Sequence, residues 1–267
     1  FQCFGGLIVK EEGSLEIYVI DGYIQSIFLV EYPDRLLLLD SGCRCDVDSV
    51  VDYITIKLNR PISDLKLVLV THMHPDHAGG AARFQKKYGI PVASLDMERQ
   101  WYAGPKGSFQ HVLDIFLAYW VGHRKKRPLR WLWYPKNLKP DFVIKDGQTI
   151  KDFEEWQLIL NPGHTDRDFS LYHKLTDSAY LGDVVIKIAK GFLPPVPVND
   201  LDTYRQSIDL ISNLKLKRVF LAHGGICSVA DEDYLAVSKA AADTPSDRDI
   251  AFSIIKGFVK KLLGERR

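Results

Sequence analysis

Histidines and aspartates gathered in one short stretch are the clearest candidates for chemistry in this sequence. Residues 71–77 read Thr-His-Met-His-Pro-Asp-His, so four side chains of the metal-ligand type fall within six positions: His72, His74, Asp76 and His77. Histidine nitrogens and carboxylate oxygens together suit zinc, iron or manganese. Because burying four such groups near a core is costly unless they are paired, the stretch predicts a metal site.

Three more candidate ligands follow downstream, and each stands just past a short apolar run typical of a strand. They are His164, Asp183 and His223. A loop that follows a buried strand can turn such side chains into a cleft. The seven groups together exceed what one tetrahedral ion binds, which indicates two adjacent ions.

The elements expected to position these residues alternate between strands and helices, which favours an α/β fold. Apolar runs at 36–39 and 65–70 fit buried strands, and each ends directly before polar candidate residues. Apolar residues recur with helical spacing over 46–58 and 78–88. After residue 141 we expect four strands, a helix, a further strand and C-terminal helices, at 142–144, 156–160, 170–173, 179–181, 203–214, 218–222 and 230–267.

Residues 99–140 differ in style from the rest and are interpreted as an aromatic-rich helical insertion. They hold four of the five tryptophans, an apolar helix candidate at 109–121 and a basic run at 124–127. One hypothesis is a lid whose side chains line an apolar substrate pocket. The alternatives are packing on the body of the protein or on a partner subunit and, least favoured, contact with a membrane surface. The pocket residues expected under the lid hypothesis are Phe109, Phe116, Tyr119 and Trp120, with Ile115 beside them.

In combination, these motifs resemble the metallo-β-lactamase superfamily. Its H-x-H-x-D-H signature appears at 72–77, and its later P-G-H-T, G-D and H-G elements follow in order at 162–165, 182–183 and 223–224. An early D-[ST]-G turn appears at 40–42, after an apolar run. The resemblance covers residues 17 to 225 and implies a four-layer αββα sandwich with metals at one edge, between the two sheets.

The resemblance also implies how two ions share the candidate ligands. Three histidines would hold the first ion, an aspartate and two histidines the second, and another aspartate would bridge both: His72, His74 and His164; Asp76, His77 and His223; and Asp183. A hydroxide held by the metals would be the nucleophile, and Asp76 would orient it. Zinc is the expected ion, with iron or manganese as alternatives.

Several branches of the superfamily fit this chain poorly. A carboxylate at Asp183 is unlike the true β-lactamases, and His74 stands where flavodiiron proteins have glutamate. The glyoxalase II branch has a histidine at the position of Met73. Nucleases of the β-CASP type add a further domain after the metal motifs, whereas only a short tail follows Gly225 here.

The remaining expectation is a hydrolase of a small molecule. Its substrate would be an ester, lactone, thioester or phosphodiester with a hydrophobic part, and the dimetal hydroxide suits all four reactions. A mononuclear iron sulfur dioxygenase, a nuclease or phosphodiesterase of the same fold, and a non-catalytic metal-binding module stay open as alternatives.

The composition limits which classes of partner the chain is expected to bind. The chain has 267 residues, with 35 lysines and arginines against 34 aspartates and glutamates. A net charge of +1 argues against a dedicated nucleic-acid partner. The sequence holds no apolar run of the roughly 20 residues that a membrane span needs. We expect one domain over residues 1–267 and a cytoplasmic location, and a homodimer stays open. Since the chain begins at Phe1 rather than at methionine, a preceding signal peptide also stays open.

Overall fold

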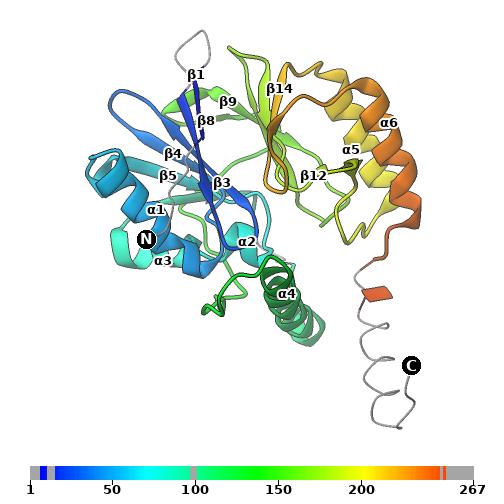
Figure 1. Ribbon diagram of the computed structural model, residues 1–267, viewed down its shortest axis with the longest axis horizontal. Helices are drawn as coiled ribbons and strands as arrows, with labels where there is room; N and C mark the ends of the chain where they lie inside the picture. The colour runs from blue at the N-terminus through cyan, green and yellow to red at the C-terminus, as the bar shows by residue number, and fades with distance from the viewer. Residues whose placement is uncertain (1–6, 11–15, 97–100, 247–248, 251–267) are drawn as a thin grey trace.

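Two β-sheets lie face to face, and helices cover the outer face of each, in the computed structural model (Figure 1). The structure describes residues 7–10, 16–96, 101–246 and 249–250. The layers follow the order helix, sheet, sheet, helix, which is the four-layer sandwich expected from the sequence.

The first sheet has seven strands in sequence order. Strands β1 to β4 are antiparallel neighbours, whereas β4, β5, β6 and β7 run parallel to one another. The parallel part brings the carboxyl ends of β4 and β5 to one edge. The strands are β1 (Leu7–Lys10), β2 (Glu16–Asp21), β3 (Ser26–Glu31), β4 (Leu36–Leu39), β5 (Leu65–Leu69), β6 (Val92–Ser94) and β7 (Phe142–Val143).

The second sheet has six strands in the order β15-β14-β11-β10-β9-β8. Strands β11 and β14 are parallel, and β9 points the same way because β10 lies antiparallel between β9 and β11. A separate hairpin follows β11. The strands are β8 (Thr149–Ile150), β9 (Phe153–Leu160), β10 (Phe169–His173), β11 (Ser178–Tyr180), β14 (Arg218–Leu221) and β15 (Gly225–Cys227), and the hairpin is β12 (Ile186–Ile188) with β13 (Gly191–Leu193).

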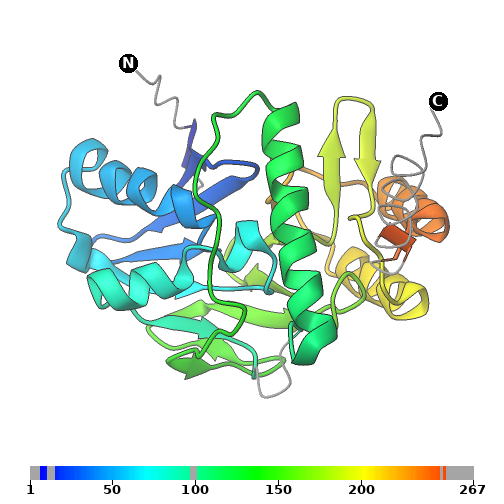
Figure 2. The ribbon, with the colours of Figure 1, turned by 90° about the horizontal axis from the view of Figure 1, so that it is seen from below.

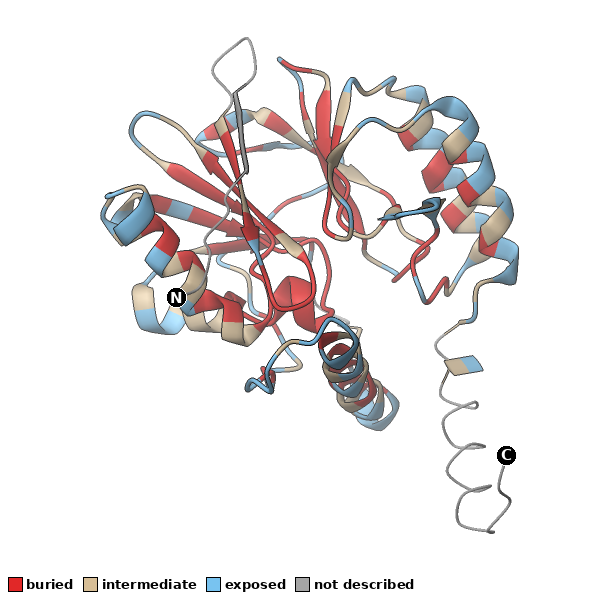
Figure 3. Ribbon diagram, in the orientation of Figure 1, coloured by how far each residue is buried: buried red, intermediate tan, exposed pale blue. Residues whose placement is uncertain are grey.

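Three apolar layers hold the sandwich together, and both sheets are largely buried (red in Figure 3). Successive side chains of a strand point to opposite faces, so each strand contributes to two layers. In β4, Leu36 and Leu38 pack toward the helices, whereas Leu37 and Leu39 pack toward the second sheet. This explains why the central strands read as continuous apolar runs.

The expected helices form, with local breaks. The helix expected at 46–58 is a succession of η1 (Arg44–Asp46), α1 (Val47–Asp52) and η2 (Tyr53–Lys57). The helix expected at 78–88 is divided into α2 (Pro75–Ala78) and α3 (Ala81–Tyr88). Two glycines occupy the break, and close packing requires the first, because a Cβ on Gly79 would lie 2.8 Å from the backbone nitrogen of Arg44. A short turn, η3 (Ile62–Asp64), precedes β5.

The second sheet is covered by α5 (Leu201–Asn213) and α6 (Asp231–Ala240), which a short turn, η4 (Ala241–Asp243), follows. Of the C-terminal helices expected over 230–267, α6 is the first. The last part of this range falls almost entirely outside the described residues, which after 246 include only 249–250.

The region expected as an insertion lies between β6 and β7. Its helix, α4 (Gly104–Arg124), is longer than the 109–121 expected, and residues 125–141 then run back beside it (Figure 2). Helix α4 crosses one side of the molecule, between the first sheet and the hairpin β12–β13. Among the described helices, none combines the length and hydrophobicity that crossing a bilayer requires.

Candidate metal centre

All seven candidate ligands lie just beyond the carboxyl ends of strands. The loop that follows β5 carries His72 and His74, and α2 carries Asp76 and His77. The loops after β9, β11 and β14 carry the remaining three: His164, Asp183 and His223. Because β9, β11 and β14 point the same way, these loops meet the β5 loop at one edge of the sandwich.

A glycine lets the loop that carries His164 approach the other ligand-bearing loops. Gly163 has a φ of +135°, a conformation that side chains disfavour. A Cβ at this position would also lie 2.5 Å from Cα of Tyr204 in α5. The glycine therefore lets the loop pass against α5 and turn His164 inward.

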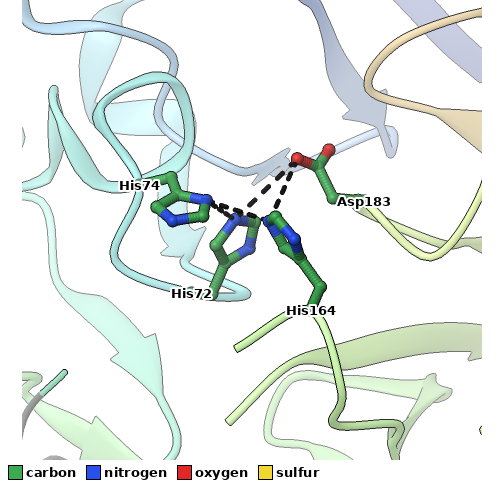
Figure 4. A group of neighbouring side chains, drawn as sticks. All are labelled: His72, His74, His164 and Asp183. Atoms are coloured by element: carbon green, nitrogen blue, oxygen red, sulfur yellow. Dashed lines mark hydrogen bonds and ion pairs between the residues drawn. The ribbon is translucent and has the colours of Figure 1, made fainter. Parts of the chain in front are cut away.

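A first group of ligand atoms comes from three histidines and one aspartate (Figure 4). Nε2 of His72 and Nε2 of His164 each lie 3.0 Å from Nδ1 of His74. Asp183 Oδ2 lies 3.6 Å from His164 Nε2 and 4.0 Å from His72 Nε2. Four donor atoms thus face one point, as the tetrahedral coordination of zinc requires.

A second group lies beside the first and contains Asp76, His77 and His223. Nε2 of His223 lies 3.1 Å from Asp76 Oδ2, and Nε2 of His77 lies 3.8 Å from the same oxygen. The other oxygen of Asp183, Oδ1, lies 3.2 Å from His77 Nε2 and 3.5 Å from His223 Nε2. The Asp183 carboxylate therefore stands between the two groups, with one oxygen toward each.

Buried polar atoms inside this centre lack hydrogen bonds, which fits a bound cation. Nε2 of His77 and Oδ1 of Asp183 are both buried and, although they lie 3.2 Å apart, neither makes a hydrogen bond with any described residue. Buried polar atoms are rarely left in this state without a functional reason. Coordination of a divalent ion would satisfy both atoms, so the donor set fits a metal. Metal binding by the seven residues stays a prediction.

Contacts behind the centre orient two of the histidines. Nδ1 of His77 lies 2.6 Å from Asp40 Oδ2, and Nδ1 of His164 lies 2.6 Å from the carbonyl oxygen of Pro197. A carbonyl can only accept, so Nδ1 of His164 carries the proton and its Nε2 presents a lone pair to the centre. From the sequence, Asp40 was expected only as part of a turn motif, because its contact with His77 depends on the pairing of β4 with β5.

Helix α4 adds a carboxylate that was not expected from the sequence. Oδ2 of Asp114 lies 3.8 Å from Nε2 of His74 and accepts a hydrogen bond from the Tyr102 hydroxyl. Its other oxygen accepts a hydrogen bond from Gln110. A signal was present, because Asp114 is the one acidic residue in the apolar run 109–121.

Electrostatics prepare the first group to bind a cation. Burial lowers the pKa of His72 well below its usual value and lowers that of His74 to about 3. Both rings are therefore neutral and can donate a lone pair. Burial acts against ionisation of Asp183 as well, but the neighbouring histidines, His77 first, outweigh it and hold its pKa well below the usual value.

In the second group, neighbouring carboxylates raise the pKa of a histidine, whereas burial lowers it in the first group. Burial would lower the pKa of His77, but the carboxylates of Asp183, Asp40 and Asp76 outweigh burial and raise it well above its usual value. The protein thus surrounds this site with negative charge. A divalent cation would supply the positive charge that a proton otherwise supplies there.

A cavity of about 460 Å³ opens beside the centre. His74, Asp76, Asp183 and His223 form part of its wall. Apolar side chains from α4, from the β2–β3 turn, from β12 and from the loop after β13 form much of the rest: Leu117, Ala118, Val121, Ile24, Ile186 and Val196. The cavity can therefore place an apolar group next to the candidate metal centre.

The four aromatic residues expected to line a pocket lie elsewhere. Of the described residues that line the cavity, none is Phe109, Phe116, Tyr119 or Trp120. Helix α4 does border the cavity, but it turns toward it the face that carries Asp114, Leu117 and Val121. The sequence assignment of the pocket is corrected accordingly. A helix that is apolar on nearly all sides does not reveal which face points inward.

Known proteins of one superfamily resemble this chain in sequence. A family model described as "Metallo-beta-lactamase superfamily" matches residues 20–223. A probable metallo-hydrolase of Bacillus subtilis, YybB, is 23% identical over 202 residues, which cover 74% of this chain and 79% of that one. The exodeoxyribonuclease WalJ of Streptococcus pneumoniae is 29% identical over 94 residues, about a third of each chain (33% and 34%).

Solved structures share the fold. A metallo-β-lactamase from Pontibacter korlensis superposes with a TM-score of 0.60 at 18% identity, covering 90% of this chain and 100% of that one. An archaeal superfamily protein from Sulfolobus tokodaii gives a TM-score of 0.59 at 18% identity, covering 84% of each chain. At such identities the likeness concerns the fold alone.

Proposed function

Because the chain belongs to the metallo-β-lactamase superfamily, we propose that it is a metal-dependent hydrolase with two divalent ions, zinc first among the candidates. Its substrate would be a small ester, lactone, thioester or phosphodiester with an apolar part. The observation that carries the proposal is the position of Asp183, whose two oxygens face two separate groups of ligands. Two bound ions would lower the pKa of a water molecule and supply the nucleophile.

The residues around the centre have separate roles in this proposal. Asp76 lies at the cavity wall and within 3.1 Å of His223, where it can accept a proton from a water molecule that enters the centre. Asp183 holds the two groups of ligands at a fixed separation. The apolar wall formed by Leu117, Val121 and Ile24 would hold the apolar part of the substrate and exclude water from that side.

Metal content combined with a substrate panel tests the proposal. Wild type should hold two divalent ions per chain and hydrolyse at least one class in a panel of esters, lactones, thioesters and phosphodiesters, single-stranded DNA included. Asp183→Asn should lower the metal content and abolish hydrolysis. The matched control is His123→Ala, which removes an exposed histidine of α4 and should change neither.

Three outcomes would contradict the proposal. One iron per chain with no hydrolysis would favour the sulfur dioxygenase, and bound metal with no turnover of any substrate would favour a non-catalytic module. Hydrolysis at the wild-type rate in Asp76→Ala would show that the reaction occurs at another site.

A further inference from the structure

The outer side of α4 and the chain that follows it form a surface rich in exposed aromatic side chains. We call this surface the aromatic face. Phe116 and Trp120 on α4 are 64% and 55% exposed, and Trp131 beyond the helix is 66% exposed. Its members are Phe109, Phe116, Trp120, Leu129, Trp131 and Trp133. Large apolar side chains gathered on one surface mark a site of interaction.

The segment after α4 presents its tryptophans outward by simple alternation. Leu132 and Tyr134 are buried in the core, whereas Trp131 and Trp133 between and beside them are exposed. The segment lies against α4, because the Tyr119 hydroxyl accepts a hydrogen bond from the backbone nitrogen of Leu132. Helix and segment therefore lie side by side, as Figure 2 shows, and their exposed side chains share one side of the molecule.

Charge on this surface is strongly one-sided. Residues 103–136 contain seven lysines and arginines and a single acidic residue, the buried Asp114, although the whole chain has a net charge of only +1. Of the seven, Arg127 pairs with the exposed Asp21 at the end of β2, which leaves six. Arg124 lies 4.9 Å from the ring centre of Trp120, so cation and aromatic ring share the surface. Across the cavity mouth, Lys187 and Lys190 of the hairpin β12–β13 are also exposed.

The aromatic face borders the mouth of the cavity. Phe116 and Trp120 point outward, while their chain neighbours Leu117 and Val121 line the cavity. On the opposite side of the mouth, Val196 is both a cavity wall residue and 58% exposed. Apolar side chains thus reach from the outer surface to the cavity wall, where Lys125 and Lys187 stand among them.

We propose that the aromatic face docks on a lipid bilayer that carries anionic headgroups. Tryptophan prefers the boundary between water and hydrocarbon, and lysine and arginine beside it pair with anionic lipids. A second copy of the chain fits this surface poorly, because a symmetric contact would bring the two basic runs together. Docking itself is independent of the proposed hydrolase. Only the consequence that an apolar substrate enters the cavity from the bilayer rests on the proposed function.

Sedimentation with vesicles tests the docking. One set of vesicles contains phosphatidylcholine alone, and in the other about a third of the lipid is phosphatidylglycerol. We expect the protein to bind the anionic vesicles more tightly, to bind less at high salt, and to shift its tryptophan emission to shorter wavelength when bound. The double variant Trp120→Ser/Trp131→Ser should bind at least about tenfold more weakly to both sets.

Charge reversal separates the contribution of the basic side chains to vesicle binding from that of the tryptophans. Arg124→Glu/Lys126→Glu should bind the anionic vesicles at least about tenfold more weakly and leave binding to phosphatidylcholine nearly unchanged. Matched controls come from the turn between β10 and β11, which lies at the ends of these strands opposite the metal centre. Leu175→Ser and Lys174→Glu change an exposed leucine and an exposed lysine there and should bind as wild type does.

Several outcomes would overturn the proposal. These are no binding to either set of vesicles, equal binding by the wild type and the double variants, and a concentration-dependent dimer that only the tryptophan variant abolishes. Metal content and turnover of a water-soluble substrate, measured on the same variants, should stay at wild-type levels. Failure of docking is thereby distinguished from failure of the proposed hydrolase.

Discussion

Asp40 Oδ2 lies 2.6 Å from Nδ1 of His77, and both side chains are completely buried. The same carboxylate accepts hydrogen bonds from the backbone and hydroxyl of Thr71 and from the hydroxyl of Tyr180. One carboxylate therefore connects both sheets to the loop that carries His72 and His74. Partners of this kind fix the ring of a ligating histidine and raise its affinity for metal.

Asp40→Asn should weaken binding of the second ion. The substitution removes the negative charge behind His77, and asparagine tolerates the left-handed backbone at this position, where φ is 61°. We expect metal affinity to fall by about 10- to 100-fold, measured by competition with a chelator. Tyr180→Phe is the control, because it removes one donor to Asp40 and keeps the charge. An unchanged affinity in Asp40→Asn would show that this carboxylate does not support the centre.

Asp114→Asn should weaken binding of the first ion, to a smaller extent. The 3.8 Å between Asp114 Oδ2 and His74 Nε2 is longer than a hydrogen bond, so the carboxylate acts through its charge. We expect a loss of about three- to tenfold in metal affinity. Tyr102→Phe, which removes a hydrogen bond to Asp114 and leaves its charge, should lose less. Equal losses in both variants would indicate that only the packing of α4 matters.

Val121→Trp should narrow the range of substrates. Val121 lines the cavity, so a larger side chain there would occupy the space proposed for the apolar part of the substrate. We expect kcat/KM to fall by about tenfold or more for esters with long acyl chains and much less for acetyl esters. Phe116→Trp adds bulk on the outward side of the same helix and serves as the control. A uniform loss across acyl lengths would place the substrate elsewhere.

Asp46→Asn should change how stability depends on pH. Burial raises the pKa of Asp46 to about 7 from a usual value of 3.8, so between these values the folded protein binds a proton that the unfolded chain has released. Stability of the wild type should therefore fall, relative to the variant, as pH rises through this window, by up to about 1.4 kcal/mol per pH unit.

Denaturant unfolding of the wild type and Asp46→Asn at several pH values provides the measurement. Asp48→Asn, which changes an exposed aspartate of α1, controls for a general effect of charge. Parallel stability profiles for the wild type and Asp46→Asn would contradict the prediction.

The sequence predicts the strands and the ligand positions because both depend on local patterns. Fully apolar runs such as 36–39 must be buried on both faces, and the spacing within 71–77 is itself the motif. The hairpin β12–β13 was not anticipated, because its strands are only three residues long and largely exposed, and Lys187 stands in the first of them. The alternation Ile186-Lys187-Ile188 is only three residues long, too short to predict a strand on its own.

Contacts between distant segments account for what the sequence did not predict. Asp40 meets His77 because β4 pairs with β5, and Asp114 meets His74 because α4 crosses the edge of the sandwich. The orientation of α4 follows from Ile115 and Ala118 entering the core, which leaves Phe116 and Trp120 outside. Since the helix is apolar on several sides, periodicity alone does not distinguish its core face from its exposed face.

Anomalous X-ray scattering at the absorption edge of the bound metal tests the central claim most directly. Crystals of the metal-loaded protein should show two peaks, one among His72, His74 and His164 and one among Asp76, His77 and His223, with one oxygen of Asp183 directed at each. A single peak, or peaks outside these two groups of side chains, would contradict a dinuclear centre bridged by Asp183.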